Sequence, residues 1–207
     1  MHKKLSSLCL LGVILLSGCG KNVETSVNNP VTSPDNTYIT TITVDTCDLC
    51  GKRQPNVRVD IGVDTSQINR EYFGYTNKHS QLVKVEAKEL FLQTKDEEQH
   101  KGRYCKDEAK VPGTEKPDLD EGHVIADSLG GASNAYNITP QKASVNRDGG
   151  SQYNLEQEFI SLLKSGVRIT DVVVLITYPD EHTMTPSSYE FRWVQNGSSR
   201  SLTIDNK

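Results

Sequence analysis

The chain of 207 residues is poor in cysteine and aromatic side chains and has no excess of positive charge. It holds five cysteines, its aromatic content is 6%, and its formal net charge is −4 at pH 7. A protein that binds nucleic acid mainly by displacing counterions is expected to be basic. The charge therefore argues against a stable nucleic-acid-binding module. It does not exclude an enzyme that receives phosphate through a metal ion and a few local groups.

No apolar run at the N-terminus is long enough for a comfortable transmembrane helix. Residues 5–16 are apolar, follow Lys3 and Lys4, and lead into Leu16-Ser17-Gly18-Cys19, which resembles a lipobox. This predicts a lipoprotein signal peptide over residues 1–18, with an uncleaved anchor or an ordinary secretory peptide as alternatives. Lipid on Cys19 would anchor the protein to a bacterial membrane, outside the cytoplasm.

Residues 19–40 are rich in Ser, Thr, Asn and Pro. Such a segment cannot bury enough apolar surface to fold, which predicts a flexible linker. Loss of residues 1–18 would remove Lys3 and Lys4 and change the net charge from −4 to −6. Residues 41–207 contain no internal repeat and are short enough for one folded domain.

The small number of cysteines limits the roles that their thiols can have. Beyond the signal peptide and Cys19, only Cys47, Cys50 and Cys105 remain. A closed zinc site needs four ligands, and no second C-x-x-C is present. A disulfide between Cys47 and Cys50, or from one of these two to Cys105, is the simpler interpretation in an oxidising compartment. Zinc and free or redox-active thiols remain alternatives. A disulfide oxidoreductase is disfavoured because no thioredoxin-like pattern surrounds the pair.

Apolar periodicity predicts an α+β domain. Leu155, Phe159, Leu162 and Leu163 fall on one helical face, so we expect a helix over 151–165 that ends at Gly166. Residues 94–118 are charged and carry Gly and Pro, which predicts a long loop. Alternating or β-branched segments predict strands at 38–44, 57–63, 81–90, 167–178 and 189–193. Strands on both sides of one helix give an α+β layout.

The stretch from Asp120 to Arg147 is too polar to build a core. It holds one imidazole, His123, two amides nine residues apart, Asn137 and Asn146, and an arginine beside the second amide. Neutral imidazole can take a proton from water, and an amide oxygen can help to hold a hard divalent cation against a phosphate.

The D-x-G-H of residues 120–123, followed by Asn137 and Asn146-Arg147, resembles the DNA/RNA non-specific endonuclease family. These are the ββα-metal, or His-Me finger, nucleases. The chain is similar to the bacterial branch D-x-G-H-L-I-A…G-G…N-L-x-P-Q…N-R, and the likeness extends over residues 70–198. It implies an antiparallel sheet with a metal-bearing helix, a strand that His123 ends or follows, and Asn146 near the start of the 151–165 helix.

The resemblance also implies an activity and a cofactor. The protein would hydrolyse phosphodiester bonds of DNA, and of RNA as a second substrate, with His123 as general base. Asn146 would bind one Mg²⁺ that keeps several waters, with Mn²⁺ as the alternative cation. Asn137 would hold phosphate or the water shell of the metal, and Arg147 would clamp phosphate. Beside nucleic acid, the expected partners are the membrane, through the lipid, and an inhibitor or immunity protein.

Three further residues complete the predicted site. Asp120 orients the motif or the ring, with a turn-forming acid as the alternative. Gly122 supplies backbone freedom before the base. By the resemblance, an acidic helix residue would hold metal-bound water; Glu156 is the first choice and Glu158 the second, because a two-residue offset lets only one of them face inward.

Glu121 departs from the family pattern, because several relatives carry arginine at this position. An acid there removes a phosphate contact and adds repulsion near the scissile group. Two alternatives to the leading hypothesis follow: a related hydrolase restricted to one nucleic acid, and a catalytically inactive lipoprotein that keeps the fold and acts as a binding module.

Overall fold

The computed structural model describes residues 31–32, 38–41, 51–64, 67–94, 111–114 and 116–207. The predicted signal peptide, the lipidation site Cys19 and the disulfide candidates Cys47, Cys50 and Cys105 lie outside these residues. Strand β1 (Val31–Thr32) of the predicted linker pairs antiparallel with β2 (Tyr38–Thr41), which begins in the linker and ends just beyond it. No helix in the described part of the chain is long and apolar enough to span a bilayer.

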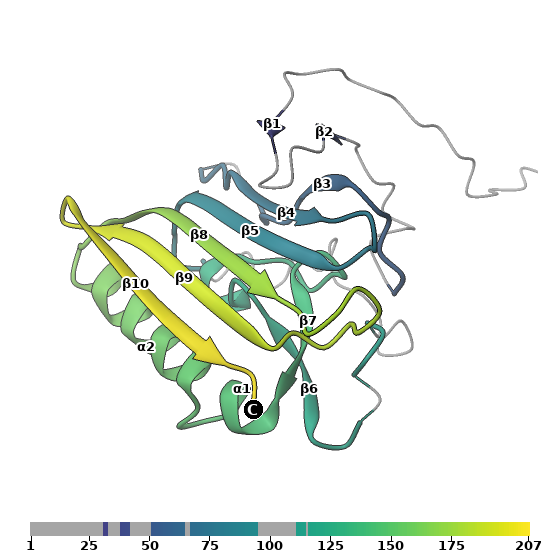
Figure 1. Ribbon diagram of the computed structural model, residues 1–207. Helices are drawn as coiled ribbons and strands as arrows, with labels where there is room; N and C mark the ends of the chain where they lie inside the picture. Colours follow the sequence, from purple (N-terminus) through teal and green to yellow (C-terminus); the bar gives the residue numbers. More distant parts are fainter. Residues whose placement is uncertain (1–30, 33–37, 42–50, 65–66, 95–110, 115) are drawn as a thin grey trace, which may run out of the picture.

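One sheet organises the fold (Figure 1), and its strand order in the described residues is β1-β2-β3-β4-β5-β8-β9-β10. All neighbours are antiparallel except β2 and β3. The bounds of the remaining strands are β3 Val57–Asp60, β4 Tyr72–Thr76, β5 Leu82–Glu89, β8 Ile169–Thr177, β9 Ser188–Gln195 and β10 Ser198–Asp205. The predicted α+β class with an antiparallel sheet is confirmed.

Helix α2 (Ser151–Lys164) covers one face of this sheet, across β8, β9 and β10 (Figure 1). Its apolar stripe buries Leu155 and Phe159, and the Phe159 ring meets Trp193 of β9 edge-on at 5.2 Å. Edge-to-face pairs of buried rings contribute beyond the area they bury. Gly166 has φ +82°, and Val167 N–H donates to the Leu162 carbonyl, so the predicted glycine cap is confirmed.

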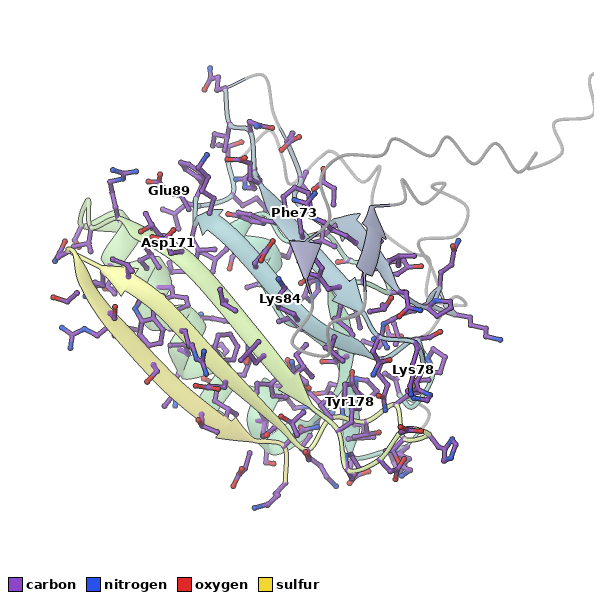
Figure 2. The ribbon with its side chains drawn as sticks, turned by 45° about the horizontal axis from the view of Figure 1, so that its top comes forward. Phe73, Lys78, Lys84, Glu89, Asp171 and Tyr178 are labelled. Atoms are coloured by element: carbon purple, nitrogen blue, oxygen red, sulfur yellow. The ribbon has the colours of Figure 1, made fainter. Side chains whose placement is uncertain are left out.

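The opposite face of the sheet carries charged side chains over aromatic rings. Phe73 and Lys84 project from it on neighbouring strands (Figure 2). The Arg58 guanidinium lies 3.4 Å from the Phe73 ring centroid, and Lys84 Nζ lies 3.8 Å from that of Tyr75. Cation–π contacts of this kind stabilise a half-buried surface without making it apolar. None of the predicted site residues within the described part of the chain belongs to a strand of this sheet.

A second, two-stranded sheet carries the polar stretch. Strand β6 (Leu119–His123) pairs antiparallel with β7 (Ile138–Lys142), in the register His123↔Ile138, and helix α1 (Ala143–Asn146) follows at once. We call β6 and β7 the site ribbon; Figure 1 shows it with α1 beside the main sheet. The prediction that His123 ends a strand is confirmed. Asn146 ends the short helix α1, five residues before α2 begins, and Gly150 caps α2.

Candidate active site

His123 stands at the end of β6 with one ring nitrogen engaged. Its Nε2 lies 2.8 Å from Ser133 Oγ, which belongs to the loop between the two ribbon strands. Burial lowers the pKa of His123, while the negative charge of Asp127 opposes that shift. Burial disfavours the charged imidazolium, so the ring is neutral at pH 7. Ser133 was not anticipated from the sequence, because a serine after Gly-Gly-Ala carries no spacing signal of its own.

Asn137 fastens the loop that joins His123 to Ser133. Its Oδ1 accepts from Ile125 N–H at 3.0 Å, and its Nδ2 donates to the carbonyls of Ile125 at 2.8 Å and Ala132 at 3.0 Å. The side chain is 0% exposed. Its hydrogen-bonding capacity is thus spent on backbone groups. From the sequence we expected Asn137 to contact phosphate or metal-bound water. In the structure its amide instead bonds to the backbone of the loop.

The Gly130-Gly131 pair is required by close packing. Gly130 has φ +79°, and a Cβ there would lie 2.1 Å from Arg70 Nε. Gly131 pairs with Gly62, and a Cβ on it would lie 2.1 Å from the Ile125 carbonyl oxygen. The loop therefore packs backbone against backbone, which only glycine permits.

Gly122 is also required by space and not by backbone freedom. Its φ lies outside the left-handed region, which the described glycines at 51, 113, 130, 149, 166 and 197 occupy. A Cβ on Gly122 would lie 2.2 Å from Gln141 Cδ. The buried Gln141 side chain crosses under this point and donates to the His123 carbonyl at 3.3 Å. The predicted reason for Gly122 is therefore corrected: the space beside Gln141, and not backbone freedom, requires glycine here.

Asp120, Asn146 and Arg147 form one hydrogen-bonded group. Arg147 grips the Asp120 carboxylate with two bonds, Nε–Oδ2 at 3.0 Å and NH2–Oδ1 at 2.7 Å. Asn146 Nδ2 donates to Asp120 Oδ2 at 3.3 Å. The Arg147 hydrogen bond is the main cause that lowers the pKa of Asp120, so this carboxylate is ionised across the neutral range. No hydrogen bond among the described residues joins this group to His123.

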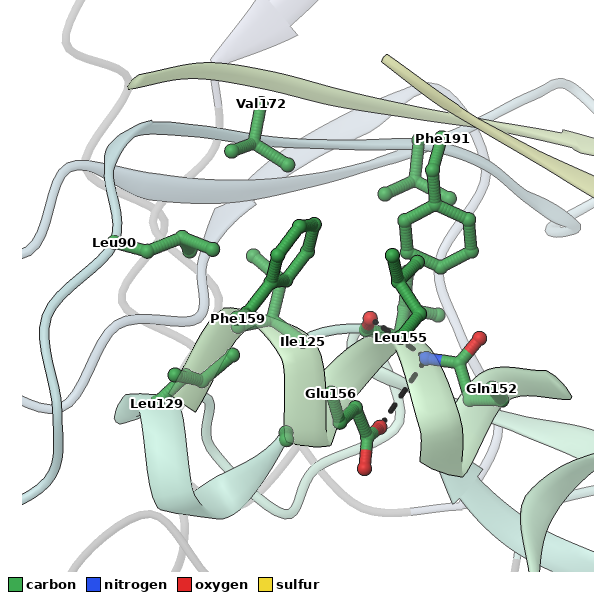
Figure 3. A pocket seen from close by; sticks show the side chains of 12 residues that line it. Leu90, Ile125, Leu129, Gln152, Leu155, Glu156, Phe159, Val172 and Phe191 are labelled. Carbon is green, nitrogen blue, oxygen red and sulfur yellow. Dashed lines mark hydrogen bonds between the residues drawn. The ribbon is translucent and has the colours of Figure 1, made fainter. Parts of the chain in front are cut away.

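Helix α2 turns Glu156, and not Glu158, toward the loop that follows His123. Glu158 is exposed, whereas Glu156 lies at an apolar pocket (Figure 3). Gln152 Nε2 donates to Glu156 Oε1 at 3.2 Å and to the Val124 carbonyl at 3.5 Å. Burial raises the pKa of Glu156 to about 7, against a smaller lowering by Gln152. Apolar side chains that line the pocket include Leu90, Leu129, Leu155, Phe159 and Phe191.

The oxygen donors present suit a hard cation that keeps most of its water. Among the described residues, no three His, Cys, Asp or Glu side chains gather as a metal cluster. The site offers instead one carboxylate, on Asp120, and one amide on Asn146 whose nitrogen is already committed to that carboxylate. Mg²⁺ is commonly held by one or two protein oxygens and several waters. The donor set fits that pattern.

The family profile described as DNA/RNA non-specific endonuclease matches residues 63–195, more than half of the chain. Among curated proteins, the chain is similar to the type VII secretion system protein EssD of two Staphylococcus aureus strains, USA300 and NCTC 8325. Each is 27% identical over 135 residues, which cover 64% of this chain and 21% of the relative. The chain thus spans about a fifth of the length of the curated relatives it matches.

Solved structures agree in fold. The magnesium-bound crystal structure of NucA from Streptococcus agalactiae superposes with a TM-score of 0.54 at 15% identity, over 72% of this chain and 77% of that chain. The metal-free structure of the same protein gives 0.51 at 14% identity, over 71% and 77%. At this identity the likeness establishes the architecture and leaves the roles of single residues to the geometry above.

Proposed function

Because the chain belongs to the DNA/RNA non-specific endonuclease family, we propose that it is a metal-dependent endonuclease that hydrolyses phosphodiester bonds of DNA and, as a second substrate, RNA. One observation carries the proposal: a neutral His123 ends β6 with Nε2 held by Ser133. A neutral imidazole fixed on one side is suited to take a proton on the other.

His123 acts as the general base through Nδ1. In the tautomer with hydrogen on Nε2, that nitrogen donates to Ser133 Oγ and the lone pair stays on Nδ1. The Nδ1 atom then takes a proton from the water that attacks phosphorus. Positioned acid–base groups of this kind contribute about 10²- to 10⁴-fold in rate. The Asn137 bonds to Ile125 and Ala132 support this role, because they hold the loop that presents Ser133.

Asn146 is the proposed protein ligand of the cation, through Oδ1. Its Nδ2 donates to Asp120, which turns the amide oxygen away from that carboxylate. Asp120 is thus proposed to orient the ligand rather than the imidazole. When bound, Mg²⁺, or Mn²⁺ as the alternative, supplies positive charge that stabilises the pentacovalent transition state and the leaving oxygen.

Arg147 has N–H groups to spare for a phosphate. Two of its five donors face Asp120, and the side chain is exposed. It can therefore hold phosphate without leaving the carboxylate. Glu156 remains the predicted holder of metal-bound water, supported by its inward position and by the Gln152 link to Val124, the residue after the base.

The test is cleavage of plasmid DNA and of RNA by the full chain, in Mg²⁺ and in EDTA, beside His123→Ala and Asn146→Ala. We expect metal-dependent cleavage by the native protein. His123→Ala should lose about 10²-fold or more in kcat with circular dichroism unchanged, and Asn146→Ala should need more Mg²⁺ for half-maximal rate. Equal activity in EDTA would refute the metal, and full activity of His123→Ala would refute the base.

The second candidate is a binding module that keeps the fold without catalysis. Two observations favour it: Glu121 is exposed two residues before His123, and the chain is acidic. If the native protein cleaves neither nucleic acid with any divalent cation, this candidate leads. In either case we propose that the protein acts outside the cytoplasm through lipid on Cys19, and mass spectrometry of the membrane fraction tests that anchor.

A further inference from the structure

The outer edge of the site ribbon has no strand beside it in the described residues, yet its backbone groups are satisfied. In β7, Ile138, Pro140 and Lys142 turn polar backbone atoms away from β6. An edge with unpaired groups is costly when it is buried, and residues 138–141 are buried. Pro140 has no N–H to place there, which suits an edge position.

Two side chains from distant parts of the sequence supply the missing partners. Arg53 donates from Nε to the Ala135 carbonyl at 2.5 Å and from NH2 to the Ile138 carbonyl at 2.6 Å. Asn206 donates to the Pro140 carbonyl at 3.1 Å and accepts from Lys142 N–H at 2.8 Å. Together they bond along β7 as a neighbouring strand would.

Arg53 is an unusual occupant of this position. It is 4% exposed, and no described carboxylate forms an ion pair with it; the ionisable side chains around it are those of Tyr136, Tyr178 and Tyr189. Burial lowers the pKa of its guanidinium. A buried cation without an anion is expensive, so its hydrogen bonds to backbone carbonyls must matter to the fold at this point.

Asn206 also ties the ribbon to the main sheet. Its Nδ2 reaches the Pro186 carbonyl at 2.8 Å, and its own N–H donates to the Ser187 carbonyl at 2.9 Å. Pro186 and Ser187 lead directly into β9. The amide is 7% exposed. Both Arg53 and Asn206 lie outside residues 63–195, which the family profile covers.

We propose that Arg53 and Asn206 are positioning residues of the active site, which replace a third strand beside β7 and fix His123 relative to Asn146. Strand β7 pairs with His123 at Ile138 and continues directly into α1, which ends at Asn146. A shift of β7 would therefore move the two residues against each other. The expected effect on catalysis rests on the proposed function, whereas the expected effect on the position of the ribbon does not.

The experiment compares Arg53→Met with Arg200→Met in the full chain. Arg200 is exposed on β10, so the control removes the same charge without touching the ribbon. At a temperature where both variants are folded, we expect Arg53→Met to lower kcat about tenfold or more while KM changes less than about threefold, because misplacement of reacting groups costs rate more than binding. Arg53→Lys, which keeps a donor, should restore part of kcat.

Amide hydrogen exchange tests the same proposal without a measurement of nuclease activity. The amides of Val124 and Ala143, bonded to the Asn137 and Asp118 carbonyls, should exchange faster in Arg53→Met and in Asn206→Leu, with β8 amides unchanged. In the double variant the losses in kcat should be less than multiplicative, since both act through β7.

Three outcomes overturn the proposal: folded Arg53→Met and Asn206→Leu with native kcat, ribbon amides with native exchange, or acceleration that is uniform across the sheet. If Arg53→Met does not fold, Arg53→Lys and Asn206→Asp, which keeps only the acceptor, decide by the same measurements. A native protein that lacks nuclease activity refutes the proposed function, and the exchange data then still decide whether these side chains hold the ribbon.

Discussion

Replacement of Asn137 by alanine separates a structural role from a catalytic one. The change removes three hydrogen bonds, from Ile125 N–H and to the carbonyls of Ile125 and Ala132. Each bond contributes about 1 kcal/mol, and a buried group left without a partner costs up to about 3 kcal/mol. We therefore expect the free energy of unfolding to fall by about 3 kcal/mol.

A loss of that size should leave the protein folded, because domains of this kind are stable by about 5–15 kcal/mol. It corresponds to a fall in Tm of about 6–12 °C. Urea unfolding followed by tryptophan fluorescence measures it directly. Asn154→Ala is the matched control: Asn154 is exposed and makes one bond, to the Gly149 carbonyl at 3.1 Å. We expect the control to change stability by less than about 0.5 kcal/mol.

The two roles of Asn137 predict different kinetics. If Asn137 holds the loop, its removal lowers kcat because Ser133 is misplaced, and it lowers the free energy of unfolding as well. A phosphate contact, when removed, raises KM and leaves the unfolding curve where it was. An Asn137→Ala protein with native stability and a raised KM would refute our reading and restore the one suggested by the family pattern.

Three further predictions follow from charge. Because burial lowers the pKa of His123 from the ordinary 6.5 and the neutral ring is the active form, kcat/KM should fall on the acid side with a midpoint below pH 6.5; a midpoint above 6.5 would contradict this. Glu121→Arg should lower KM for DNA and steepen its salt dependence by about one phosphate contact, and an unchanged salt slope would count against it. Because the pKa of Glu156 is raised to about 7, the stability it contributes is full below pH 4.5 and is lost as pH rises through 7; Glu156→Gln in EDTA should gain about 1–3 kcal/mol at pH 8 and none at pH 4.

The parts of the fold that bury one clean face could be predicted from the sequence. Strand β8 contains a continuous apolar run, β9 alternates apolar and polar residues, and the apolar face of α2 ends at Gly166, so each was recognisable from its local pattern. Strand β10 was missed because nearly all of it is exposed, which erases alternation. Its signal was the Asn196-Gly197 pair, with φ of 51° and 75°, a two-residue hairpin turn.

Strand β7 could not be predicted, for a different reason. Ile138-Thr139-Pro140-Gln141 is buried but polar, and its edge is completed by Arg53 from 85 residues away and by Asn206 near the C-terminus. No local sequence pattern indicates such distant partners. The motif likewise pointed to Asn137 without its role, because an amide at this position can hold a loop as well as a phosphate. The tasks became visible only with the hydrogen bonds.

The measurement that tests the central claim most directly is chemical rescue of His123→Gly by imidazole. The variant should cleave plasmid DNA in Mg²⁺ at a small fraction of the native rate, and added imidazole should restore cleavage in a saturable way that follows the neutral form of the added base. Asn146→Ala should show no such rescue. If His123→Gly cleaves at the native rate without imidazole, His123 is not the base and the account fails. If the native protein is inactive under every metal condition, the nuclease proposal fails with it.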